Sequence, residues 1–189
     1  MGRNDDSDIK IFTPSKKSGD GVELVELVEM MEKYRSNGNT EKAVALGKHL
    51  ADLTSAVFAD VFEDTGLTAQ ALSSGSLYQL RALMVFSAQY SLCRFLEHAV
   101  LSTEAVNSLY NEIRKLSEGF YANVTDGSSF TFYFLAVRRK RDVEKKIGES
   151  FAMLCDKEKD ERYSALGTNT FKVVQRLVFE SIEKAEFEQ

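Results

Sequence analysis

Apolar residues recur every three or four positions along most of this chain, and the glycines fall mostly between the periodic segments. This spacing places apolar side chains on one face of an α-helix, because such a helix turns once every 3.6 residues. Pro14 is the single proline, so no later residue deprives a helix interior of a backbone donor. The pattern predicts an all-α protein of five to seven antiparallel amphipathic helices in a bundle.

The periodic segments give approximate bounds for these helices. They are predicted over residues 21–36, 40–64, 76–100 and 103–119, from Phe130 past Leu154 (one long helix or two with a bend), and over 169–186. The segment 76–100 is apolar on all sides, which indicates a central helix surrounded by others. The apolar stripe of the first helix consists of Leu24, Leu27, Val28 and Met31.

The segment from Phe120 to Phe134 leaves two alternatives open. Aromatic and β-branched residues flank Asp126-Gly127, which is typical of a β-hairpin. Alternatively a loop leads to a helix capped at Ser128 or Ser129. We favour the helix, since a lone hairpin in an all-α protein has no strand to pair with. The apolar residues in this segment also make it a candidate partner-binding loop.

The composition of the N-terminus differs from that of the rest of the chain, and the two parts are expected to differ in order. Residues 1–20 are polar, charged and rich in Gly and Ser, which predicts a disordered tail, and residues 21–189 are predicted to form a single helical domain. No signal-like or membrane-spanning apolar stretch stands out, so we expect a cytoplasmic protein that does not enter membranes. Cys93 and Cys155 lie in apolar helical stretches and are expected to be buried free thiols.

A short motif occurs twice. Leu46-Gly47-x-x-Leu50-Ala51-x-Leu53 matches Ile147-Gly148-x-x-Phe151-Ala152-x-Leu154, and both glycines fall within predicted helices. A glycine there usually lets another helix approach closely. Apolar positions at Leu46, Leu80, Ile113 and Ile147 follow the period of tetratricopeptide units, whose first helix the motif resembles. The expected downstream Ala, Phe and Pro are missing, so a tetratricopeptide-like array of helical hairpins is the runner-up to a simple bundle.

Charge argues against one class of partner and suggests another. The net charge of −5 and the pI near 5.2 are unlike those of proteins that bind nucleic acid over a whole surface. One basic segment nevertheless stands out, and it consists of Arg138, Arg139, Lys140, Arg141, Lys145 and Lys146. On a single helix these residues would form a positive collar that binds phosphate or another anion, nucleic acid or an acidic protein partner. The alternative is a solvated helix surface.

The first helix carries the opposite charge. Its acidic ridge consists of Glu23, Glu26, Glu29 and Glu32, which follow one another at intervals of three. The acidic ridge is a candidate partner for the basic segment, either within the chain or across a dimer. Because exposed ion pairs add only about 0–1 kcal/mol each, such contacts would set orientation more than affinity. The alternative is again a water-exposed helix face.

The residues that usually carry catalysis or bind metals show no recognisable arrangement. A di-metal site in a helical bundle needs Glu three residues before His, but Leu46 precedes His49 and Phe95 precedes His98 at that spacing. We therefore predict no metal, no cofactor and no named catalytic residue, and the question of enzyme activity stays open with a preference against it.

These observations favour a non-enzymatic, cytoplasmic protein–protein interaction module of the adaptor or scaffold kind, with self-association as one form. One alternative is a small-molecule-sensing regulatory domain that holds an apolar ligand in a pocket among its Phe and Tyr residues. The other is an enzyme without a recognisable motif.

Overall fold

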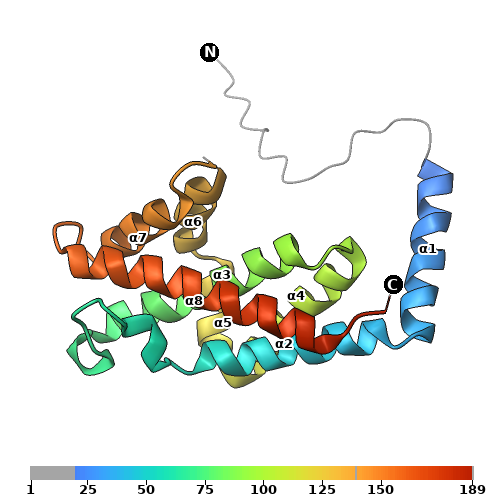
Figure 1. The fold of residues 1–189 in the computed structure, drawn as a ribbon, viewed down its shortest axis with the longest axis horizontal. Helices are drawn as coiled ribbons and strands as arrows, with labels where there is room; N and C mark the ends of the chain where they lie inside the picture. The colour runs from blue at the N-terminus through green and yellow to red at the C-terminus, as the bar shows by residue number, and fades with distance from the viewer. Residues whose placement is uncertain (1–19, 139, 189) are drawn as a thin grey trace, which may run out of the picture.

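A computed structural model describes residues 20–138 and 140–188, with side chains from Val25 onward. Within these ranges every regular element is helical, which confirms the all-α class. The α-helices are α1 (Asp20–Ser36), α2 (Asn39–Ser55), α3 (Ser74–Phe95), α4 (Ala99–Leu116), α5 (Glu118–Thr125), α6 (Ser128–Arg138), α7 (Val143–Leu154) and α8 (Glu161–Ala185). Two short 3-10 helices, Ala59–Phe62 and Ala69–Ala71, lie between α2 and α3 (Figure 1). The predicted tail lies outside the described residues, apart from Asp20.

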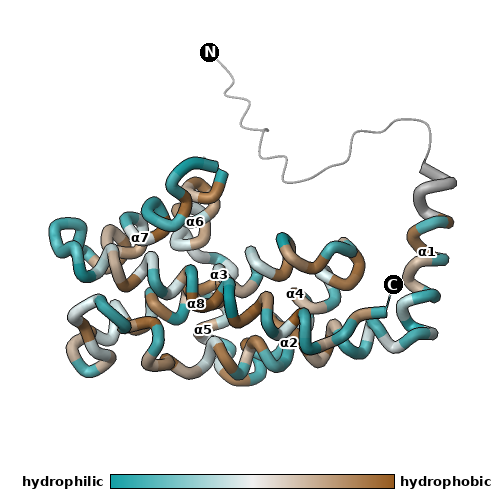
Figure 2. Tube along the Cα trace, in the orientation of Figure 1, coloured by the Kyte–Doolittle hydropathy of each residue, from teal (hydrophilic) through white to brown (hydrophobic). Residues whose placement is uncertain are grey.

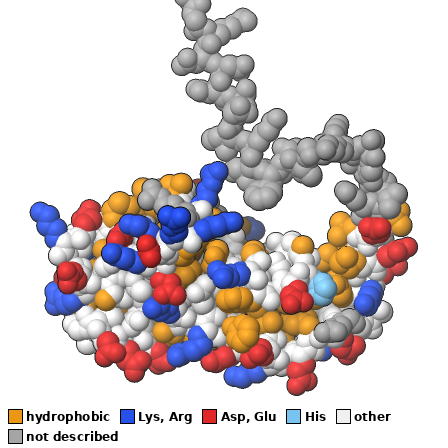
Figure 3. Space-filling view, turned by 45° about the horizontal axis from the view of Figure 1, so that its top comes forward, with side chains coloured by type: hydrophobic (Ala, Val, Ile, Leu, Met, Phe, Trp, Pro, Cys, Tyr) orange, Lys and Arg blue, Asp and Glu red, His pale blue; other side chains and the backbone are white. Residues whose placement is uncertain are grey.

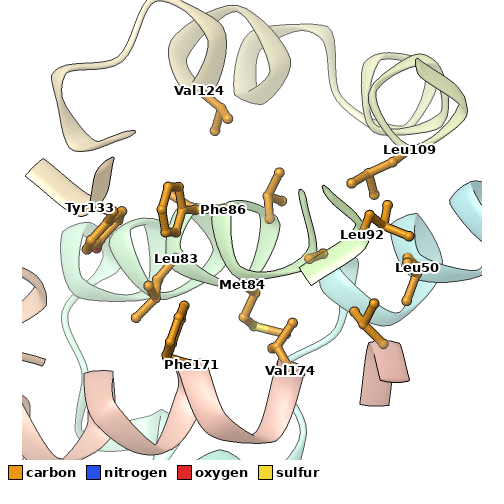
Figure 4. Packing of buried hydrophobic residues seen from close by; sticks show 14 of the residues in the cluster. Leu50, Leu83, Met84, Phe86, Leu92, Leu109, Val124, Tyr133, Phe171 and Val174 are labelled. Carbon is orange, nitrogen blue, oxygen red and sulfur yellow. The ribbon is translucent and has the colours of Figure 1, made fainter. Parts of the chain in front are cut away.

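Helix α3 is the central helix, as its all-round apolar pattern predicts. Every residue from Ala82 to Ala88 is buried. Figure 4 shows the α3 side chains pointing to different neighbours: Leu83 and Met84 toward α8, Phe86 toward α5 and α6, and Leu92 toward α2 and α4. Each large apolar side chain buried in this way contributes about 1.5–3 kcal/mol.

Several helix boundaries differ from the predicted ones. Helix α2 ends at Ser55 rather than 64, because Ala56 turns into extended backbone at φ −101° and ψ 141°. Helix α8 begins at Glu161 rather than 169, since the Asp160 carboxylate accepts a hydrogen bond from the Arg162 backbone N–H at 3.1 Å and caps the helix. Helix α4 begins at Ala99, four residues before the predicted start at 103.

The hairpin alternative for Phe120 to Phe134 is wrong, because both halves of this segment are helical. The Ser117 hydroxyl accepts a hydrogen bond from the Phe120 N–H at 3.3 Å and caps α5. Helix α6 begins at Ser128, as the favoured alternative predicts. A break then separates α6 from α7, so the two-helix form of the predicted 130–154 helix is the correct one.

Glycines bring two pairs of helices close together. A β-carbon at Gly47 of α2 would collide with the Ala105 carbonyl oxygen of α4, and one at Gly148 of α7 would collide with the Ser164 carbonyl oxygen of α8. Both motif glycines therefore act as expected. The paired helices are neighbours in sequence only for α7 and α8, whereas tetratricopeptide units pair consecutive helices throughout. The tetratricopeptide-like arrangement is not confirmed.

Helix α1 stands apart from the other helices at one end of the molecule (Figures 1 and 2). Gly38, at φ 79°, forms the corner between α1 and α2. The fully buried Asn39 ties this corner to the C-terminal segment, because its amide donates to the Glu188 carbonyl oxygen at 2.6 Å and accepts from the Glu188 N–H at 2.9 Å. The corner is thus anchored, while most of α1 extends beyond it.

Candidate functional site

Large apolar side chains are exposed mainly on two helices, α1 and α6. On α1 these are Val25, Leu27, Val28 and Met30, and on α6 they are Phe132, Phe134 and Leu135. Scattered exposed apolar residues are normal on a protein surface, whereas neighbouring ones indicate an interaction site. Helix α6 combines such residues with a nearby hollow and with the basic segment, so its surroundings form the candidate site.

The inner face of α6 is fixed to the centre of the protein by aromatic contacts. The Phe86 ring of α3 lies 5.4 Å from the Phe130 ring and 5.2 Å from the Tyr133 ring, measured between centroids. The Ser129 hydroxyl adds a hydrogen bond of 3.0 Å to the Gln79 side chain of α3. Tyr133 is fully buried by these contacts. Because residues on one helix face are three or four apart, Phe132 and Leu135 fall on a different face from Tyr133.

This outer face borders a surface hollow of about 380 Å³ between α6 and α7, which we call the α6–α7 groove. Its lining consists of Phe132, Leu135, Ala136, Lys146, Glu149, Ser150 and Met153. Lys146 and Glu149 form an ion pair of 2.6 Å within the lining, and this hydrogen bond lowers the pKa of the Glu149 carboxyl. The groove thus has an apolar floor with a charged side, which suits it for binding an amphipathic segment.

The basic segment lies at one end of this groove, but not on one helix as predicted. Arg138 ends α6, Lys140 and Arg141 belong to the connection, and Lys145 and Lys146 follow in α7, while Arg139 lies outside the described residues. Lys140 and Asp142 adopt left-handed backbone angles, with φ of 55° and 50°. Such angles are costly for residues other than glycine and produce the break between the helices.

The side chains of the basic segment are available for contacts. Arg138, Lys140, Arg141 and Lys145 are exposed, and none forms an ion pair with a described residue. Figure 3 shows Lys and Arg side chains gathered beside hydrophobic surface on the left of the molecule, with α1 standing on the right. Lys145 faces a separate hollow, whose lining also includes three acidic residues, Glu63, Asp64 and Glu161. Arg138, Lys140 and Arg141 are therefore the charges that can attract an acidic group at the end of the groove.

The acidic ridge lies on α1, at the end of the molecule opposite α6 and α7 (Figure 1). Glu26, Glu29 and Glu32 are exposed, and the side chain of Glu23 lies outside those described. The structure does not bring the acidic ridge and the basic segment together within one chain. The predicted stripe of α1 is also exposed in large part, with Leu27 at 42% and Val28 at 46% exposure.

The groups that carry chemistry elsewhere in proteins are dispersed. His49 and His98 are exposed, and among the described residues no three His, Cys, Asp or Glu side chains gather as a metal site would require. Cys93 is exposed, contrary to expectation, whereas burial raises the pKa of the half-buried Cys155 thiol to about 11. A thiol with a raised pKa is a poor nucleophile at neutral pH.

The central aromatic residues fill the interior. Phe86, Tyr133 and Phe171 are each at most 1% exposed, and the Phe171 ring lies 5.7 Å from the Tyr90 ring. The Tyr133 hydroxyl is buried without a hydrogen-bond partner, and burial raises its pKa well above the usual value. These side chains pack on one another at the positions where a ligand-sensing domain would need a pocket.

Sequence reasoning identified the basic segment and named Phe120 to Phe134 as a candidate partner-binding loop. This segment is helical, and the groove between α6 and α7 was not predicted. The signal that was available is the run Phe130-Thr-Phe-Tyr-Phe-Leu-Ala-Val137, which has more apolar residues than one helix face needs. In a helix covered on one side only, the surplus must face the surface. Phe132 and Leu135 are that surplus.

No family model, no curated protein and no solved structure matches the chain. Across the described helices, none is both long enough and apolar enough to cross a membrane.

Proposed function

We propose that this chain is a protein–protein interaction module that binds an acidic amphipathic helix of its partner in the α6–α7 groove. The observation that carries the proposal is the exposed pair Phe132 and Leu135, which line an open groove. The connection between its two helices carries the exposed Arg138, Lys140 and Arg141, which form no ion pair with a described residue. A helix laid in such a groove buries its apolar face and leaves its charged face at the rim.

The apolar residues and the basic residues of the site would contribute to binding in different ways. Burial of Phe132 and Leu135 supplies binding free energy, because apolar area removed from water contributes about 25 cal/mol per Å². Arg138, Lys140 and Arg141 raise the association rate and fix the orientation of an acidic partner. A nucleic acid would satisfy these charges but would leave Leu135 uncovered, so the combination favours a protein partner.

The groove can be tested by placing a photo-crosslinking residue in it. Leu135 is replaced by p-benzoylphenylalanine in the full-length protein, which is irradiated in the cells that make it. We expect discrete adducts of higher mass at this position. The matched control carries the same residue at Asn111, an exposed position of α4 distant from the groove in sequence.

Dependence on the basic segment makes the test specific. The adducts formed at Leu135 should be lost when the same protein also carries Arg138→Glu and Arg141→Glu, since both charges lie where the two helices of the groove are joined. Adducts that are equally strong at Asn111, or that survive the charge reversal, would contradict the proposed binding mode. The identity of the captured protein does not enter this test.

A further inference from the structure

Helix α1 has apolar side chains whose exposure increases with distance from the corner with α2. Near the corner with α2, Tyr34 is 4% exposed and its ring lies 5.3 Å from the His98 ring. One turn earlier Met31 is half-buried. Farther from the body Val28 is 46% exposed and Leu27 is 42% exposed. The chain therefore covers these side chains only in the last turn of the helix.

The same helix carries most of the acidic ridge, which winds around it at intervals of three residues. Glu26, Glu29 and Glu32 are all exposed and form no ion pair with a described residue. Most helical stability in proteins comes from covering an apolar face, and most of the apolar side chains of α1 are left uncovered by this chain. Helix α1 thus exposes apolar and acidic side chains together, since the exposed Val25 and Met30 lie among the glutamates.

The α6–α7 groove has the complementary chemistry, with an apolar lining and the basic segment at its end. Within one chain the two lie at opposite ends of the molecule (Figure 1). We infer that the partner helix is α1 of a second copy of this chain, seated in the groove. This inference rests on the proposed function of the groove and names its occupant.

Reciprocal exchange is the arrangement that satisfies both copies. If each copy places its α1 in the groove of the other about a two-fold axis, every exposed face is used and the assembly closes as a dimer. A one-way contact would instead leave one groove and one α1 free and would continue into a filament. Two equivalent contacts also help to reach the roughly 1,200–2,000 Å² that stable interfaces bury.

The first test is the mass of the full-length protein in solution, measured by sedimentation equilibrium. We expect a dimer whose dissociation constant rises about tenfold or more in Glu26→Arg/Glu29→Arg, because like charges then meet at the groove. Glu118→Arg/Glu158→Arg is the matched control, since it makes the same change in net charge at exposed positions outside α1. Circular dichroism checks that each variant keeps its helices.

A charge swap tests the pairing itself. The α1 variant Glu26→Arg/Glu29→Arg and the groove variant Arg138→Glu/Arg141→Glu should each dimerise at least tenfold more weakly than the wild type when alone, because both contacts of either homodimer become repulsive. Mixed together they should form a one-to-one dimer, since both contacts of the mixed dimer are attractive. Recovery of dimer in the mixture supports reciprocal seating of α1. Failure of the mixture to dimerise contradicts it.

The remaining outcomes separate this inference from the proposed function. A monomeric wild-type protein, or a dimer unchanged by the α1 variant, overturns the inference. If Leu135 then captures a different protein in a manner that depends on Arg138 and Arg141, the groove is an interaction site for another partner. If Leu135 captures nothing above the Asn111 control, the proposed function fails as well.

Discussion

Helices α3 and α6 are similarly apolar in sequence but have different surroundings in the structure. Both contain a run of almost uninterrupted apolar residues, Ala82–Ala88 in α3 and Phe130–Val137 in α6. Helices α2, α4 and α8 cover α3 on its sides, whereas α6 is covered on the face that meets Phe86 and is exposed at Phe132 and Leu135. An apolar run therefore predicts that a helix needs cover. It does not predict whether the cover comes from the same chain.

The largest expected effect separates the covered face from the exposed one. Phe86→Ala should lower the free energy of unfolding by about 3–5 kcal/mol, because it removes the ring that joins α3 to α6 and leaves a cavity. Phe132→Ala removes the same side chain from a position that is 38% exposed and should cost clearly less than Phe86→Ala. Urea unfolding of both variants measures the difference.

A similar loss in the two variants would contradict this contrast. It would mean that Phe132 contributes to the packing of the chain itself, and the surface proposed for binding would then be part of the core. The crosslinking experiment at Leu135 would lose its rationale, since the groove would have no free apolar face.

The next largest expected change in stability comes from the close helix contact at Gly148. Gly148→Ala should destabilise the protein by about 1–3 kcal/mol, because the added carbon overlaps the Ser164 carbonyl oxygen and forces α7 away from α8. Gly119→Ala is the control, since a β-carbon there meets no atom within 4 Å and improves a helical position in α5. The control should raise stability by up to about 0.5–1 kcal/mol in the same assay.

High pH should destabilise the packing on the covered side of α6, because it ionises two partly or fully buried groups there. Burial raises the pKa of the Cys155 thiol from 9.0 to about 11 and raises that of the Tyr133 phenol well above 10.0. Both groups bind their protons more tightly when folded, so their contribution to stability is complete below pH 9 and is lost as the pH rises beyond it. The urea midpoint should therefore fall between about pH 9 and pH 11.

Two variants assign this pH dependence to its groups. Cys155→Ala should flatten the early part of the fall. Tyr133→Phe should reduce the part above pH 10, to which Tyr78 and Tyr110 also contribute because burial raises the pKa of their phenols. Tyr133→Phe should also be neutral or stabilising at pH 7, because it removes a buried hydroxyl that has no hydrogen-bond partner. An unchanged fall in both variants would assign the alkaline sensitivity to other groups.

Much of the fold could be predicted because it depends on local patterns. The central place of α3 follows from its all-round apolar sequence, and the close contacts at Gly47 and Gly148 follow from glycines inside helices. Where a boundary was wrong, a local feature outweighed the periodicity. The Asp160 cap begins α8 at Glu161, earlier than the apolar spacing indicates.

The candidate site could be predicted only in part, because its geometry depends on distant residues. The basic segment is visible in sequence, but the groove exists because α6 packs on α3 through residues far apart, such as Ser129 and Gln79. The break that splits the basic segment between two helices was also hidden. A left-handed backbone conformation is usually recognised in a sequence by a glycine, but here Lys140 and Asp142 adopt it.

The break between α6 and α7 gives the smallest expected change in stability. Two variants test it, and they should change stability in opposite directions. Lys140→Gly should stabilise the protein by about 0.5–1 kcal/mol, because glycine adopts a φ of 55° without the strain that a lysine side chain imposes. Lys145→Gly removes the same charge from within α7 and should destabilise by a similar amount, since glycine is a poor helix former. Thermal unfolding compares the two. If both variants shift the midpoint in the same direction, loss of basic charge rather than backbone strain governs this segment, and the exposed end of α6 is shaped by its charges alone.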